Sequence, residues 1–363
     1  MALAATHANA QSPAASLTVA QVADLSPAQQ DVSRDFLAGA RVAWQNFNAQ
    51  GGLHGRPVRH WVLETDGTSA SLQAAWQAAH ADSNCIALSG CVGDSTASRL
   101  LALAQTHKAA PALAQAAPWL QNSTNDVGDT TFPIFAGRQS QIAHAVRALA
   151  VMGVQDLGVV YAHDIERAST EAEMTQAATS LGLRLRAFQP TVNTTLAQLG
   201  RTLDKGAPII MMFVGGTPEL LEFVGGLQAQ QRRRYVVALA DVNLQVLAQS
   251  GVTIHSSVSV IATQVVPMLN SAIPVVRAYR ENLAKLFDEP PSPIGLAGFI
   301  AARYTAQVLA SMDAAFTRQN VLAAFQRRSS MDMDGFIVNF KNGLRSAASV
   351  TLGMLASDGR IVG

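Results

Sequence analysis

Asn48-Ala49-Gln50-Gly51-Gly52-Leu53-His54-Gly55-Arg56-Pro57-Val58 is the stretch that decides the fold of this 363-residue chain. Before it, apolar side chains recur at the spacing of one helix face, at Phe36, Ala40, Ala43 and Phe47. Gly51 and Gly52 can adopt the positive φ angles with which helices end. The apolar run 58–64 then has the composition of a β-strand. The stretch therefore predicts a helix that ends in a glycine turn and leads directly into a strand.

The same alternation of strand and helix patterns extends along nearly the whole chain, which is typical of doubly wound parallel sheets. Strands are expected in two series, at 17–23, 58–64, 85–90 and 112–113, and at 157–161, 184–188, 209–214 and 235–240. A chain of 363 residues exceeds the size at which a single core stops growing. The predicted fold class is therefore α/β, with two doubly wound parallel-sheet lobes.

Composition excludes several classes of partner. Only 14% of the residues are charged and the formal net charge is +1, so neither nucleic acid nor an anionic membrane surface is expected to bind. No apolar run of about 18 residues is present, so no membrane span is expected.

Cys85 and Cys91 flank a strand-like run that would hold their Cα atoms roughly 20 Å apart, too far for a disulfide. Two free, buried thiols are predicted. No Cys/His spacing suggests a metal, and no cofactor is expected.

The N-terminus has the character of a secretory leader remnant. Small residues run up to Ala8-Asn9-Ala10, an A-x-A cleavage pattern, and polar residues follow it. We expect residues 1–16 to be such a remnant and the protein to be exported to the periplasm. The alternative is an ordinary alanine-rich, disordered N-terminus.

The 48–58 stretch, preceded by Gly39-Ala40 and followed by Asp66, resembles type I periplasmic binding proteins of the leucine/isoleucine/valine-binding family. The resemblance continues through 90–96, 159–161, 213–219, 278–279 and 298–306. It implies two lobes joined by three hinge crossovers, with residues 17–135 and 265–330 in the first and 136–264 and 331–363 in the second. It also implies a small solute held by hinge closure, an inner-membrane ABC permease as partner, and a monomer or weak dimer.

Candidate solute contacts in the first lobe follow the strands, because ligands of open α/β sheets bind beyond the carboxyl ends of strands. Asp94, Ser95 and Thr96 open a helix, whose N-terminal N–H groups suit an anion. Plain N-capping by Asp94 or Ser95 is the alternative. Gln115 stands where the family usually has hydroxyl-bearing residues, and Trp119 either walls the site or packs in the core.

Candidate contacts in the second lobe are Tyr161 and His163 after one strand, and Gly216 and Thr217 before a helix opened by Pro218. Asp241 follows the strand 235–240, near where relatives place an acid for the ammonium group of an amino acid. Asn243 is a weaker candidate. Because the neighbouring loops depart from the family pattern, the predicted solute is a partly apolar organic acid, an amide or an unusual amino acid.

Two other functions remain open at this point. A receptor of the same fold could report solute occupancy to a regulator, as amide receptors do. Gly93-Asp94-Ser95 also matches the start of a G-D-S hydrolase block, but in such enzymes the block follows the first strand and here it follows the third. The sequence contains none of the P-loop, G-x-G-x-x-G, H-E-x-x-H and G-x-S-x-G patterns sought, so no catalytic residues are expected.

Overall fold

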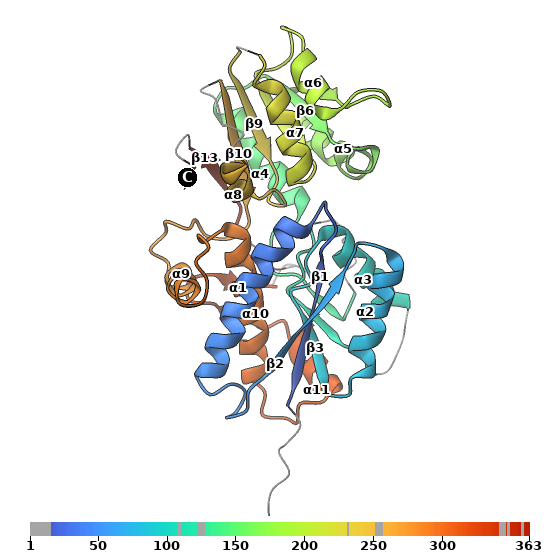
Figure 1. Ribbon diagram of the computed structural model, residues 1–363, viewed down its shortest axis with the longest axis vertical. Coiled ribbons are helices and arrows are strands. Elements are labelled where there is room, and N and C mark those ends of the chain that lie inside the picture. Colours follow the sequence, from blue (N-terminus) through green and yellow to red (C-terminus); the bar gives the residue numbers. More distant parts are fainter. Residues whose placement is uncertain are drawn as a thin grey trace, which may run out of the picture.

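The computed structural model describes residues 16–106, 111–121, 128–230, 232–250, 257–340, 346, 349–356 and 359–363. Two α/β lobes lie end to end along the long axis of the molecule, each with its own sheet (Figure 1). This arrangement confirms the predicted fold class. The expected leader remnant lies outside the described residues. No described helix is both long and apolar enough to cross a membrane.

The first lobe is built on a five-stranded sheet with strand order β2-β1-β3-β4-β5, in which all neighbours are parallel. Its strands are β1 (Thr18–Asp24), β2 (Arg59–Thr65), β3 (Cys85–Ser89), β4 (Ala114–Ala116) and β5 (Thr131–Phe132). The helices between them are α1 (Gln30–Ala49), α2 (Ser69–Ala81) and α3 (Asp94–Thr106). Every residue of β1 is buried, as expected for a strand inside a parallel sheet that is covered on both faces.

Three later helices return to this lobe: α9 (Pro274–Leu286), α10 (Pro293–Ala310) and α11 (Arg318–Gln326). In Figure 1, α10 lies beside α1 along most of its length. The two backbones approach so closely that a Cβ atom at Gly39 would overlap the carbonyl of Gly295, and one at Gly298 would overlap the carbonyl of Phe36. The first core is therefore completed by segments about 250 residues apart in the sequence.

The second lobe is built on a seven-stranded sheet with strand order β14-β13-β10-β9-β8-β6-β7. Its strands are β6 (Asp156–Tyr161), β7 (Arg184–Phe188), β8 (Ile210–Val214), β9 (Arg234–Ala238), β10 (Val258–Gln264), β13 (Thr351–Leu355) and β14 (Ile361–Val362). Its helices are α4 (Arg138–Val151), α5 (Asp164–Ser180), α6 (Leu196–Thr202), α7 (Thr217–Leu227) and α8 (Leu244–Gln249). β13 and β14 are antiparallel to their neighbours, whereas the other five strands are parallel.

The chain passes between the two sheets three times: after β5, after β10 and before β13. The last passage corrects the expected return to the second lobe at residue 331. β11 (Met331–Asp332) and β12 (Ile337–Val338) form a short hairpin, and Met333, Phe336 and Phe340 are buried in the core of the first lobe. These apolar side chains keep the chain on the first lobe as far as Phe340.

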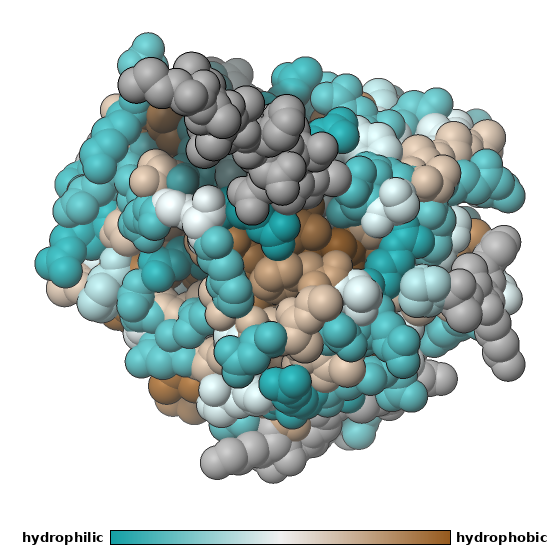
Figure 2. Space-filling model, turned by 90° about the horizontal axis from the view of Figure 1, so that it is seen from below, coloured by the Kyte–Doolittle hydropathy of each residue, from teal (hydrophilic) through white to brown (hydrophobic). Residues whose placement is uncertain are grey.

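The first-lobe end of the molecule has a mainly hydrophilic surface (Figure 2). Seen from the first-lobe end, polar residues surround a smaller apolar area near the centre (Figure 2).

Cys85 and Cys91 are both buried and free, as the sequence predicts.

Candidate functional site

The two sheets turn their carboxyl ends toward the junction between the lobes, and side chains meet there. Asn243 caps α8 in the second lobe, and its Nδ2 donates to Asp35 Oδ2 on α1 of the first lobe at 3.0 Å. A Cβ atom added to Gly216, the N-cap of α7, would lie 3.5 Å from the carbonyl oxygen of Ala28. The lobes therefore touch along the loops that follow their strands.

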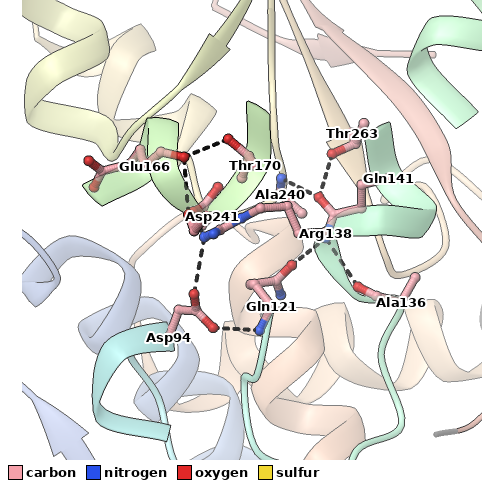
Figure 3. A network of polar contacts seen from close by, with 11 residues as sticks. Asp94, Gln121, Ala136, Arg138, Gln141, Glu166, Thr170, Ala240, Asp241 and Thr263 are labelled. Carbon is pink, nitrogen blue, oxygen red and sulfur yellow. Dashed lines mark hydrogen bonds and ion pairs between the residues drawn. The ribbon is translucent and has the colours of Figure 1, made fainter. Parts of the chain in front are cut away.

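A charged cluster lies in this junction and contains two of the predicted residues (Figure 3). Arg138 Nη2 is 3.0 Å from Asp94 Oδ2 at the start of α3, and 3.6 Å from Asp241 Oδ2 after β9. The side chains of Arg138, Asp94 and Asp241 are only 11%, 17% and 16% exposed. The guanidinium thus joins an acid of the first lobe to an acid of the second.

The positive and negative charges of the cluster do not cancel. Arg138 is the first residue of α4, where the helix dipole disfavours a cation, so its position depends on the two acids. Burial alone would lower the pKa of Arg138, but Asp241 and Asp94 raise it above its usual value. Burial raises the pKa of Asp241 to about 6, although Arg138 opposes that shift. Two carboxylates against one guanidinium leave the cluster with a net negative charge whenever both acids are ionised.

The cluster also has unused hydrogen-bonding capacity. Asp241 Oδ1 and Arg138 Nε are both buried without a hydrogen-bond partner. Buried polar atoms normally find partners, so these two atoms mark a place where a polar ligand would gain contacts.

The other first-lobe candidates are not brought to the cluster. Ser95 is exposed beside it, whereas the Thr96 hydroxyl is buried and donates to Asp24 Oδ2 at 2.7 Å. Gln115 lies within β4, not in the loop where the sequence placed it, and its Nε2 donates to the Leu100 carbonyl at 3.4 Å. β4 begins at Ala114 because Leu88 and Ser89 of β3 pair with Gln115 and Ala116.

Trp119 does follow β4 and is buried at the junction. Its ring packs edge-on against Phe36 at 5.8 Å between centroids and lies 5.5 Å from the ring of Phe135. Its indole Nε1 is buried without a partner.

Of the second-lobe candidates, Tyr161 ends β6 with its ring in the core, where burial raises its pKa to about 12. His163 is the N-cap residue of α5 but makes no side-chain capping hydrogen bond; it is more than half exposed, and its Nε2 lies 3.5 Å from Glu219 Oε1. Thr217 is buried, and its Oγ1 accepts from the backbone N–H of Asn243 at 2.9 Å. Gly216 and Thr217 thus lie at the lobe contact, whereas Tyr161 does not.

Arg138, Asp31 and Asp35 are among the junction residues that the sequence did not predict. Asp31 and Asp35 lie in the first two turns of α1, where acids are ordinary because they suit the helix dipole. Burial raises the pKa of both, and Thr217 and Glu219 of the second lobe are near Asp31. For Arg138 the only local signal is an unusual one, a cation directly after the helix N-cap Gly137.

A small cavity of about 20 Å³ lies beside the cluster, between the lobes. Both lobes line it, with Trp119, Pro293 and Ile294 from the first, and Ala240, Val242, Asn243, Leu244, Ala262, Thr263 and Gln264 from the second. Its lining is mainly apolar, and its volume is about that needed by one water molecule. The junction between the lobes therefore combines a charged cluster with an apolar cavity.

Comparison with solved structures shows the same fold. An extracellular ligand-binding receptor from Verminephrobacter eiseniae superimposes with a TM-score of 0.86 at 16% identity, covering 96% of this chain and 100% of that chain. A substrate-binding periplasmic protein from Ralstonia solanacearum gives 0.81 at 22% identity, covering 95% and 99%. The branched-chain amino acid transporter substrate-binding protein from Streptococcus pneumoniae, in complex with isoleucine, gives 0.80 at 12% identity, covering 96% and 98%.

Sequence comparisons give a family but no curated relative. A search of curated proteins by sequence gives no match. The periplasmic binding protein family model matches residues 16–360, nearly the entire chain. The family expected from the 48–58 stretch is thus confirmed, and the chain belongs to the periplasmic binding protein family.

Proposed function

We propose that this protein is the solute-binding component of an ABC-type importer, which captures a small organic solute by closure of its two lobes. The observation that carries the proposal is the cluster of Asp94, Arg138 and Asp241, in which partly buried charges from both lobes meet beyond the ends of parallel strands. On this proposal the first lobe comprises residues 17–135 and 265–340, and the protein acts as a monomer or weak dimer in the periplasm with an inner-membrane permease as its partner. Its proposed role is to bind the solute and not to catalyse a reaction.

The charges favour one of the three expected solute classes, the unusual amino acid. A solute with an ammonium group would supply the positive charge that the cluster lacks and a donor for Asp241 Oδ1. The apolar cavity wall beside Trp119 would suit a partly apolar side chain. The isoleucine complex of the Streptococcus pneumoniae protein is consistent with this chemistry.

A thermal-shift screen across amino acids, amides and organic acids tests the proposal. A solute at 100 times its Kd adds about 2.7 kcal/mol to the free energy of unfolding, which is a clear shift in melting temperature. We expect hits among amino acids, and we expect the corresponding acids without the amino group to give none. Equal shifts for both would show that the ammonium group is not recognised.

The role of Asp241 is tested on the strongest hit. Asp241→Asn should raise its Kd at least 10-fold, measured by calorimetry, because the carboxylate partner of the ammonium group is removed. Asp156→Asn is the matched control, since Asp156 pairs with Arg184 on the exposed, far end of the second lobe. Uptake of the radiolabelled hit by cells with and without the gene would separate an importer component from a receptor.

A further inference from the structure

Gln141, in the first turns of α4, is fully buried and uses both ends of its side-chain amide. Its Oε1 accepts from the Ala240 N–H at 2.9 Å and from the Thr263 hydroxyl at 2.8 Å. Its Nε2 donates to the Ala136 carbonyl at 3.1 Å and also to Gln121 Oε1. Figure 3 shows this amide at the centre of the polar network.

Two of these four partners, Ala136 and Thr263, belong to segments that connect the lobes. Gln121 lies on the first lobe after β4, and Ala136 lies on the first crossover, just before α4. Thr263 is near the end of β10, where the second crossover begins. One side chain therefore holds two of the three crossovers together.

The same amide is also linked to the charged cluster on both sides. Ala240 is the neighbour of Asp241 in the chain, and its N–H is fixed by Gln141. Gln121 donates its backbone N–H to Asp94 Oδ1 at 2.7 Å, and its carbonyl accepts from the Arg138 N–H at 2.6 Å. Hydrogen bonds thus run from Gln141 to the segments that carry all three charged residues.

A buried amide with both ends satisfied fixes its neighbours in one arrangement, because breaking any of these bonds leaves a polar atom without a partner. Hinge motion between lobes requires the backbone at the crossovers to change. We infer that Gln141 is a positioning residue that couples the geometry of the Asp94, Arg138 and Asp241 cluster to the setting of the hinge. The inference rests on the proposed solute-binding role, in which closure is the functional motion.

The consequence is a change in lobe separation when the amide is lost. Gln141→Met keeps the side-chain length and removes all four hydrogen bonds, so the arrangement of the lobes described above should lose population relative to more open ones. Gln115→Met is the matched control, because Gln115 is equally buried but lies within the first-lobe sheet, with one side-chain hydrogen bond to Leu100.

Lobe separation is measured between spin labels at Ala70→Cys on α2 and Ile165→Cys on α5, two exposed positions on different lobes. Cys85 and Cys91 are buried and should stay unlabelled. In solute-free protein, double electron–electron resonance should show longer distances for Gln141→Met than for the unmodified chain. Gln115→Met should show unchanged distances even where its melting temperature falls.

Unchanged distances in Gln141→Met would overturn the inference. If Gln141→Met fails to fold, Gln141→Glu is used in its place. Glutamate keeps the acceptor for Ala240 and Thr263 and loses the donor to Ala136 and Gln121. Distances in Gln141→Glu equal to those of the unmodified chain would also refute the inference. The measurement contains no solute. A failure of the thermal-shift screen to find a solute would therefore count against the proposed function alone.

Discussion

Arg138 Nη2 lies 3.0 Å from Asp94 Oδ2, and this ion pair connects the first helix of the second lobe to the first lobe. Replacing Arg138 by Met would leave Asp94 and Asp241 facing each other without a cation. Removing one partner of a buried ion pair costs about 3 to 5 kcal/mol, and the residual exposure of this pair reduces the expected loss to about 2 to 4 kcal/mol. Urea denaturation of Arg138→Met measures it.

Arg184→Met is the control for that experiment. Arg184 makes a bidentate pair with Asp156, with contacts of 2.7 Å, but the two side chains are 71% and 54% exposed. Solvent screens exposed pairs, so Arg184→Met should leave the free energy of unfolding nearly unchanged. Equal losses in the two variants would contradict the view that the Arg138 pair is held in the lobe junction.

The stability of the protein should depend on the ionisation of Asp241. Its pKa is raised to about 6 in the folded state, so the folded state binds this proton more tightly than the unfolded state does. The contribution of Asp241 is therefore fully present below about pH 4 and is lost as the pH rises through about 6. The difference in unfolding free energy between the unmodified chain and Asp241→Asn should change by about 1 to 3 kcal/mol across this window. A difference that is constant with pH would contradict the buried position of the carboxyl group.

Replacing each of two adjacent glycines of α7 by alanine should change the stability of the protein in opposite directions. Gly226 faces α6, where a Cβ atom would overlap the carbonyl of Ala197, whereas a Cβ atom at Gly225 meets nothing within 4 Å. Gly226→Ala should destabilise the protein by about 1 to 3 kcal/mol. Gly225→Ala should stabilise it by about 0.5 to 1 kcal/mol, because alanine favours a helix. Melting temperatures of the two variants decide whether α6 and α7 pack as closely as the structure shows.

Both cysteines should resist thiol reagents in the native protein. Burial raises the pKa of Cys85 to about 11 and that of Cys91 still further, so almost no thiolate forms at neutral pH. Labelling with iodoacetamide should be slow in buffer and complete in about 6 M guanidinium, which exceeds the midpoint of about 5 M that marks a hyperstable protein. Rapid labelling of one thiol in buffer would show that the first lobe opens locally.

Much of the fold follows from local sequence patterns. The glycine turn at Gly51 and Gly52 and the alternation of strands and helices are local features, and both reappear in the structure. The strand β10 was not predicted, and its pairing with β13 joins residues about 90 positions apart. Likewise, the position of Gln115 depends on its register with β3, which no local pattern specifies.

The candidate site was less predictable for the same reason. Asp94 and Asp241 each follow a buried strand, so topology placed them at the correct edge of their sheets. Both acids pair with Arg138, which lies 44 positions from Asp94 and 103 positions from Asp241 in the sequence. An arginine at the start of a helix has no local sequence pattern that predicts such distant partners. The hydroxyl of Thr96 was expected to be available, but buried Asp24 accepts its hydrogen bond. Sequence position predicts which loop a residue occupies, but packing decides where its side chain points.

The close packing of α1 on α10 has a consequence for the order in which the chain folds. During synthesis, the apolar face of α1 emerges some 250 residues before the helix that covers it, so the first lobe stays incomplete until residue 310 has left the ribosome. The strands β6 to β10 follow one another without such an interruption, and most of the second sheet can form earlier. In a nascent chain of this topology, the apolar residues that are synthesised first stay exposed longest. Chaperones therefore have an extended period in which to hold the first lobe unfolded.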